Sequence, residues 1–249
     1  MKNINVQLIT KPDFDVPGYI GGLASLTQHK RVFTPTSHEY GLNVMKRLVE
    51  MGHTSLLECA DFGFIFESTS RVFLAQITRH RMASYTSGSQ QYQDHDNFPY
   101  IIPESIENNQ DAKIKYESIM ETINMAYTEL KEIVGKDDAR YVLPGAAANH
   151  LYAKFNLREI VCAILPQRIC RRNTPESRLN IQKMAQEMIN NGFEDCIQFG
   201  GCACVTEGKC DQGRMRCKEG PYKSWEEMVG IPECTCLTSH PDYCEVHAA

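Results

Sequence analysis

The segment from residue 61 to residue 81 constrains the fold most, because two different periodicities meet within it. Three phenylalanines alternate with other residues, which predicts a strand with one aromatic face; they are Phe62, Phe64 and Phe66. Ser70 suits a helix N-cap, and apolar residues recur at helical spacing from 72 to 77. The segment therefore predicts a strand followed at once by a short helix.

A polar stretch at the C-terminal end of this helix carries the chemistry of an anion site. Arg79, His80 and Arg81 stand side by side, and hydroxyl residues with one glycine occupy 84–89. Arginine offers a planar fork of donors that matches phosphate, and small residues let backbone N–H groups approach the same oxygens. Gln76 and Arg79 are three apart, which predicts that they share a helix face and one ligand. The alternative is a solvated basic turn that offsets the helix dipole.

The rest of the chain predicts a mixed α/β fold in one large domain. Further elements are expected as strands over 4–10 and 150–156, an extended connection over 97–103, and helices over 38–51, 107–135, 156–165 and 174–191. The helix over 107–135 has the longest periodic signal, and its pattern predicts a scaffolding helix that packs on the core.

Composition excludes several classes of protein. A chain of 249 residues with 42% hydrophobic residues can bury a substantial core, so global disorder is excluded. No run approaches ~18 apolar residues and the first residues lack the apolar run of a signal peptide, which predicts a cytoplasmic protein without membrane partners. A net charge of -5 argues against nucleic-acid binding, because such proteins carry a basic excess that displaces counterions from phosphates.

Eleven cysteines in such a chain favour reduced thiols or metal ligands over disulfides. Most of them crowd the last quarter: Cys196, Cys202, Cys204, Cys210, Cys217, Cys234, Cys236 and Cys244. With His240 and His247 they supply enough ligands for a structural zinc site, although the spacing is irregular. Reduced thiols in a tail are the alternative. We expect a catalytic domain over 1–217 and a Cys/His-rich tail over 218–249.

In combination these motifs resemble the flavin-dependent thymidylate synthase family. The hallmark of that family is Arg-His-Arg, a short spacer and a serine, which match Arg79 to Arg81 and Ser89 here. Further matches are GHTSLLE from Gly52, ARYVLP from Ala139 and the triplet from Asn156 to Arg158. The resemblance covers about residues 4–217, including a Cys-containing segment similar to an extension of some bacterial members.

The resemblance implies a mixed α/β domain with a long-helix layer, assembled as a homotetramer whose active sites are built from several subunits. It implies FAD as cofactor and transfer of a one-carbon unit from methylene-tetrahydrofolate to carbon 5 of the pyrimidine nucleotide dUMP, with NADPH as reductant. The matched flavin contacts are Ser25, His53, Ser55, Arg79, His80, Arg81, Asn156 and Arg158. The matched nucleotide contacts and their neighbours are Gln76, Ser87, Gly88, Ser89, Gln91, Tyr92 and Arg140.

One arginine after the Asn156 helix is expected to face the pyrimidine base, and two candidates stay open. Arg168 keeps the helix register and is preferred, whereas Arg172 keeps the spacing to the next helix. Either can polarise a uracil carbonyl and stabilise the charge that develops on the ring. No protein nucleophile is required, although Cys59 and Cys170 are alternatives of that kind.

Two departures from the family pattern fall beside the nucleotide. Ser87 replaces an acidic residue, and Gln91 replaces an arginine whose charge-assisted bond contributes roughly 1.5–3 kcal/mol to binding. Either another basic residue compensates, or the substrate differs from dUMP. The alternative function is therefore methylation or hydroxymethylation of another pyrimidine nucleotide such as UMP. An alternative of another class is a non-catalytic, zinc-stabilised nucleotide-binding protein.

Overall fold

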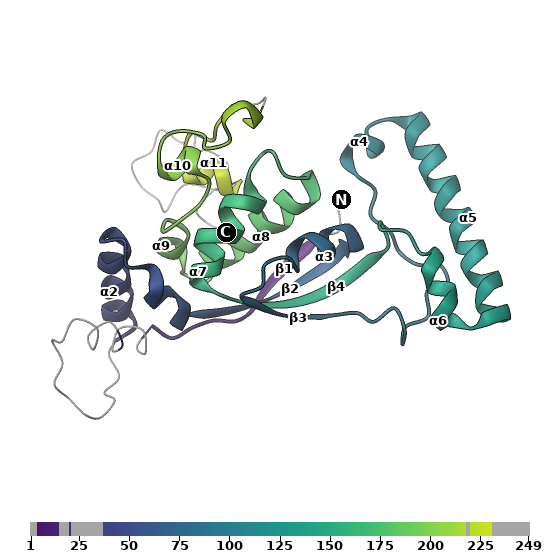
Figure 1. The fold of residues 1–249 in the computed structure, drawn as a ribbon, viewed down its shortest axis with the longest axis horizontal. Coiled ribbons are helices and arrows are strands. Elements are labelled where there is room, and N and C mark those ends of the chain that lie inside the picture. The colour runs from purple at the N-terminus through teal and green to yellow at the C-terminus, as the bar shows by residue number, and fades with distance from the viewer. Residues whose placement is uncertain (1–3, 15–19, 21–36, 218–219, 231–249) are drawn as a thin grey trace, which may run out of the picture.

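The computed structural model describes residues 4–14, 20, 37–217 and 220–230 (Figure 1). The strands are β1 (Asn5–Thr10), β2 (Asp61–Ser70), β3 (Ala83–Ser87) and β4 (Ala148–Asn156). The helices of three or more turns are α2 (His38–Glu50), α5 (Gln110–Val134) and α8 (Pro175–Asn190), together with the π-helix η3 (Ile160–Ile169). The shorter helices are η1 (Thr54–Cys59), α3 (Arg71–Ile77), α4 (Glu104–Glu107), α6 (Lys136–Ala139), η2 (Arg140–Val142), α7 (Leu157–Glu159), α9 (Glu194–Ile197), α10 (Ala203–Thr206), η4 (Gly213–Met215) and α11 (Trp225–Val229).

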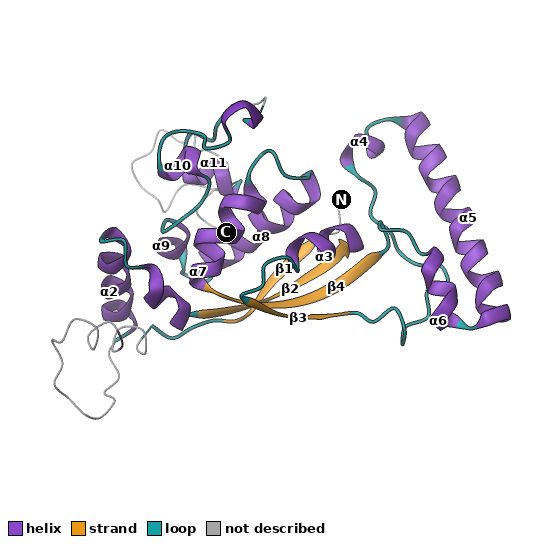
Figure 2. Cartoon of the chain, viewed as in Figure 1, coloured by secondary structure: helices purple, strands orange, loops and turns teal. Residues whose placement is uncertain are grey.

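The four strands form one antiparallel sheet in the order β1-β2-β4-β3 (Figure 2). The predicted aromatic strand is β2, and Phe62, Phe64 and Phe66 are all fully buried in the core. Phe155 on β4 adds a fourth ring, 6.4 Å from Phe64 between centroids. Alternation therefore predicted both the strand and its buried face, and the mixed α/β fold class is confirmed.

Helix α8 covers one face of this sheet, where it contacts β1 and β2, and it also packs against η3 and α3 (Figure 1). Residues of α8 at helical spacing are fully buried against these elements: Ile181, Met184, Ala185 and Met188. Helix α11 packs on α8 with Met228 and Val229 also fully buried, so part of the predicted tail joins the same core. The division of the chain at residue 217 stays a prediction. No helix in the described ranges is long and apolar enough to cross a bilayer.

The stretch that follows the Arg-His-Arg motif is a strand, not the loop expected from its hydroxyl-rich composition. Residues 83–87 pair antiparallel with β4, and Ser84 and Thr86 are exposed whereas Tyr85 is half-buried. The Tyr85 ring packs edge-on to Phe155 at 5.9 Å. Ala83 and Tyr85 mark the inner face of β3, and both are only partly buried, so the period-2 signal is too short to read in the sequence.

The prediction that the long helix packs on the main core is wrong. α5 lies beyond one end of the sheet, away from α7 and α8 (Figure 1). It packs through Met120 on a separate small cluster with Phe98 and Ala147. Several apolar side chains remain exposed on α5: Ile114, Ile119 and Ile133 of the expected face, together with Met125 and Val134. The periodicity reports an apolar stripe, and periodicity alone does not say what covers it.

Two helix ends also differ from expectation. α3 ends at Ile77, so Gln76 lies in the helix whereas Arg79 lies in the turn after it, and their shared helix face is not formed. The helix after Asn156 continues to Ile169, four residues past the predicted end. A π-helix accommodates Pro166, because a wider turn relieves the ring clash that ends an α-helix.

Candidate active site

The Arg-His-Arg motif lies in a tight turn between α3 and β3. The Ser70 hydroxyl caps α3 by accepting a hydrogen bond from the Phe73 N–H at 3.0 Å, as the sequence predicts. The Tyr85 hydroxyl closes the turn by donating to the carbonyl oxygens of Ile77 at 2.7 Å and His80 at 2.8 Å. This turn leaves Arg79 and Arg81 exposed and turns His80 into the protein.

His80 is the centre of a buried hydrogen-bond network. Its Nδ1 lies 2.9 Å from Glu159 Oε1, and its Nε2 lies 2.9 Å from Arg168 Nε. Because Arg168 can only donate, Nε2 must accept, and the proton of neutral His80 sits on Nδ1 and is donated to Glu159. Glu159 is itself held in place because its N–H donates to Asn156 Oδ1 at 2.8 Å. The Nη2 of Arg168 donates to the carbonyl oxygen of Gln76 at 2.9 Å.

The electrostatics of this network favour an anionic ligand. Burial lowers the pKa of Arg168, and the positive charge of Arg79 lowers it further. Among the described residues, no carboxylate forms an ion pair with Arg79, Arg81 or Arg168. Cations that repel one another without a carboxylate partner are stabilised when an anion binds between them.

The His80 network predicts a pH-dependent stability. Burial lowers the pKa of His80 below its ordinary 6.5, and the hydrogen bond to Glu159 opposes this effect only in part. The network with neutral His80 therefore contributes its full stabilisation above pH 6.5, and this contribution is lost as the pH falls through the lowered pKa. Each pKa unit by which folding lowers the His80 pKa corresponds to about 1.4 kcal/mol of unfolding free energy. We expect Tm to fall less between about pH 7.5 and 5.5 in His80→Asn than in the wild type. Exposed His150 supplies the control: His150→Asn should keep the wild-type slope, and an unchanged slope in His80→Asn would contradict the assignment.

Further predicted flavin contacts flank this turn at the same end of β2 and β4. His53 precedes η1, and His53 and Ser55 are exposed. Arg158 is exposed in α7 and forms an ion pair with Glu58 of η1. The Leu157 N–H donates to the Ala60 carbonyl oxygen at 2.7 Å and holds α7 beside η1. We call this region, with Gln76, Arg79, Arg81 and Arg168, the arginine end of the sheet.

The second predicted group lies at the opposite end of β3, which we call the serine end. It comprises residues 87–92 and Arg140. Ser87 ends β3, and the Gly88 N–H donates to the His150 carbonyl oxygen at 3.1 Å. Lys136 of α6 donates to the Tyr92 carbonyl oxygen at 3.3 Å and brings the segment around Arg140 to this end. The four residue steps of β3 separate the two ends by about 13 Å.

Three predicted residues remain to be accounted for: Ser25, Arg172 and His80. Ser25 lies outside the described residues. Arg172 is exposed beyond the end of η3, whereas Arg168 is part of the His80 network. Both ring nitrogens of His80 already have hydrogen-bond partners within the chain. Its predicted contact with the flavin stays a prediction, and these two bonds limit which atoms of His80 are available for it.

Comparison with known proteins decides the family. The family model described as Thymidylate synthase complementing protein matches residues 22–191. The flavin-dependent thymidylate synthase of Nitratidesulfovibrio vulgaris is 32% identical over 186 residues, which are 71% of this chain and 75% of that protein. The same enzyme of Pyrococcus furiosus is 33% identical over 196 residues, 74% of this chain and 80% of its own length.

The chain belongs to the flavin-dependent thymidylate synthase family. It is an enzyme of this type, and the resemblance inferred from its motifs is confirmed. Two solved structures share the fold of this family member. Thymidylate Synthase X from Helicobacter pylori, solved with FAD and dUMP, has a TM-score of 0.61 and 18% identity, covering 78% of this chain and 99% of that one. The UMP/dUMP methylase PolB from Streptomyces cacaoi, bound with 5-Br dUMP, has a TM-score of 0.64 and 16% identity, covering 80% and 96%.

Sequence reasoning missed several residues that hold the two predicted groups in place. Glu159 and Tyr85 fix the Arg-His-Arg turn. Glu159 contacts His80 from 79 residues along the chain, and Tyr85 bonds to the His80 carbonyl oxygen through its hydroxyl. No local sequence pattern marks either contact. Arg71 donates from Nη2 to the Gly88 carbonyl oxygen at 2.8 Å at the serine end. The sequence offers one signal for Arg71: it directly follows Ser70, which is recognisable as a helix N-cap.

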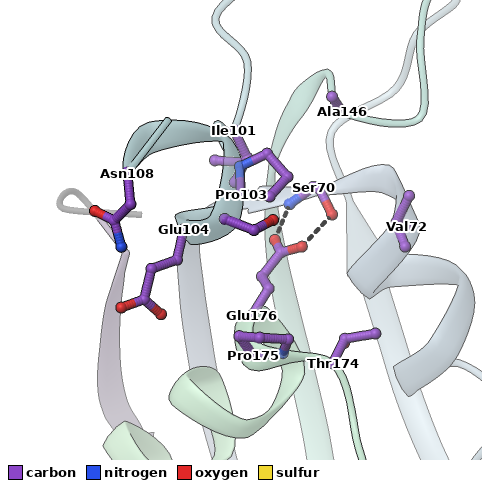
Figure 3. A pocket seen from close by; sticks show the side chains of 11 residues that line it. Ser70, Val72, Ile101, Pro103, Glu104, Asn108, Ala146, Thr174, Pro175 and Glu176 are labelled. Carbon is purple, nitrogen blue, oxygen red and sulfur yellow. Dashed lines mark hydrogen bonds between the residues drawn. The ribbon is translucent and has the colours of Figure 1, made fainter. Parts of the chain in front are cut away.

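A separate apolar cavity of about 540 Å³ lies where the start of α8 faces α3 and α4 (Figure 3). Ser70 donates from its N–H and hydroxyl to the two carboxylate oxygens of Glu176, at 2.7 and 2.6 Å. Val72, Ile101 and Pro103 supply apolar walls. Of the predicted site residues that the structure describes, none lines this cavity.

Proposed function

We propose that the protein uses FAD to transfer and reduce a one-carbon unit from methylene-tetrahydrofolate to carbon 5 of dUMP, giving dTMP, with NADPH as reductant. The observation that carries this proposal is the exposed pair Arg79 and Arg81, fixed beside Arg168 without a carboxylate partner among the described residues. The relative from Helicobacter pylori, solved with FAD and dUMP, supports it.

The donor set at the arginine end fits a flavin dinucleotide. Arg79 and Arg81 match the pyrophosphate by charge and geometry. Beside them, the Oε1 of Gln76, which is the predicted nucleotide contact at this end, is buried without a hydrogen-bond partner among the described residues, which costs stability unless a nucleotide donor reaches it. His53, Ser55 and the segment from Asn156 to Arg158 are the further residues proposed to hold the flavin. Bound FAD supplies the hydride in this family's chemistry.

The residues of this chain are proposed to bind, orient and stabilise charge. His80 and the Gln76 carbonyl oxygen hold Arg168, whose donors then face the uracil carbonyl where negative charge develops. A cysteine nucleophile is not supported at Cys59, because burial and the nearby carboxylates of Glu58 and Asp61 raise the pKa of its thiol.

The arrangement of the two ends supports a homotetramer. Gln76 and Arg168 lie at one end of β3, and residues 87–92 with Arg140 lie at the other, so one chain does not gather all the proposed nucleotide contacts around one uracil. A second copy that brings its serine end to the first copy's arginine end completes the site. The apolar side chains exposed on α5 supply surface for such an assembly.

UMP is the alternative nucleotide, and Ser87 and Gln91 are the observations that favour it. PolB, which is described as a UMP/dUMP methylase, shares the fold. Arg71 supports dUMP. Its guanidinium bonds to the Gly88 carbonyl oxygen and so places a cation beside the segment in which Gln91 replaces the expected arginine, as a compensating basic residue would.

Turnover of dUMP and of UMP by the purified flavoprotein, with NADPH and methylene-tetrahydrofolate, separates the two substrates. We expect kcat/KM for dUMP to exceed that for UMP by at least about tenfold, because a site that binds the 2′-deoxyribose closely rejects the added hydroxyl. Equal or preferred turnover of UMP would contradict the dUMP assignment while retaining the enzyme class.

A further inference from the structure

Five cysteines line one small cavity at the C-terminal end of η3. The cavity has a volume of about 30 Å³, enough for one ion or one or two waters. The thiols come from the end of η3 and from the segment 202–217, which includes α10 and η4: Cys170, Cys202, Cys204, Cys210 and Cys217. All five are free thiols.

Two of these thiols already bond to backbone carbonyl oxygens near the cavity. The buried Cys202 thiol donates to the Pro166 carbonyl oxygen at 3.7 Å, and the Cys217 thiol donates to the Gly220 carbonyl oxygen at 2.8 Å. A cation that binds here must displace the thiol protons, because the thiolate is the metal ligand.

We propose that this cavity binds one thiophilic divalent cation, zinc, through Cys170 and three thiolates of the segment 202–217. Zinc prefers four sulfur ligands at about 2.3 Å in structural sites. In the described part of the chain, no three His, Cys, Asp or Glu side chains already stand together as a metal shell, so binding requires the thiols to turn inward from the cavity wall. A cysteine has one side-chain torsion to reset, which makes this adjustment small. The tail residues from Cys234 to His247 lie outside the described residues, and the proposal does not use them.

Two charged side chains, Arg171 and Asp211, line the cavity beside the thiols. Arg171 stacks on the Tyr222 ring, with its guanidinium carbon 4.3 Å from the centroid, and supplies positive charge toward the thiolates of a zinc site. Its ion pair with Glu227 holds α11 at the same place. A bound zinc would fasten the segment 202–217 to the end of η3, two residues beyond Arg168. A bound zinc would thus stabilise η3, which carries Arg168, the arginine proposed to face the base.

Metal content tests the proposal independently of the flavin chemistry. The full-length protein is purified under reducing conditions, exposed to zinc and desalted, and zinc and flavin are measured per chain. We expect about one zinc per chain in the wild type and in the control Cys59→Ser, whose thiol lies outside the cavity, and at least a tenfold loss in Cys170→Ser with the flavin retained. Cys210→Ser provides a second variant, should Cys170→Ser fail to fold.

Cobalt substitution supplies a spectroscopic reading of the same site. We expect thiolate-to-cobalt charge-transfer absorption in the wild type that is lost in Cys210→Ser and kept in Cys59→Ser. A wild type that stays free of zinc would overturn the proposal. So would equal zinc content in the wild type and in Cys170→Ser, or a disulfide among the five cysteines in place of bound metal. Loss of flavin in a protein that still binds zinc would instead count against the proposed function.

Discussion

Arg79→Ala protein is expected to lose most of its flavin during purification. Arg79 is exposed at the arginine end and has no carboxylate partner among the described residues, so its charge is available to a ligand phosphate. Removing one charge-assisted hydrogen bond costs roughly 1.5–3 kcal/mol, which weakens binding by about 10- to 150-fold. The ratio of flavin absorbance to protein absorbance measures the effect directly.

The fold of the Arg79→Ala variant should be unaffected, because an exposed side chain contributes little to the core. Tm measured with and without added FAD checks this expectation. Arg214→Ala is the matched control, since Arg214 is an exposed arginine in η4, far along the chain from the predicted site. If Arg79→Ala purifies with the flavin content of the wild type and of Arg214→Ala, the assignment of this arginine to the flavin is wrong.

Elements with strong periodicity or clear capping could be predicted from the sequence. β2 was predicted from its alternating phenylalanines, and the start of α3 from Ser70, whose hydroxyl does cap the helix. The start of α8 was predicted from Thr174 and Pro175, although the Thr174 side chain makes no capping hydrogen bond. These features depend on residues close together in the chain, so local physics decides them.

Features that depend on contacts between residues far apart in the chain could not be predicted from the sequence. The strand β3 exists because β4 pairs with it, while its own residues read as a polar loop. The packing of α5 could not be read from its apolar stripe. The role of His80 was also hidden, because its partners Glu159 and Arg168 are 79 and 88 residues away. Motif matching singled out this turn, but only the structure shows that His80 faces inward and forms a hydrogen bond with Arg168.

Sharing of the active site between subunits predicts that two inactive variants restore each other. Arg79→Ala removes a residue of the arginine end, and Arg140→Ala removes one of the serine end, about 13 Å or more away along β3. Each variant alone is expected to lose at least about tenfold in kcat/KM for dUMP, because each lacks one charge-assisted ligand contact.

Co-expression of Arg79→Ala with Arg140→Ala should then recover activity. If each site takes its arginine end from one chain and its serine end from another, random mixing leaves about a quarter of the sites with both native residues. Differently tagged chains purified through both tags ensure that only mixed assemblies are assayed, and each variant co-expressed with itself supplies the control. Sites contained within single chains would give a mixture no more active than the two variants apart. Recovery toward a quarter of the wild-type rate would therefore establish that the distance between the two ends is closed by a second subunit.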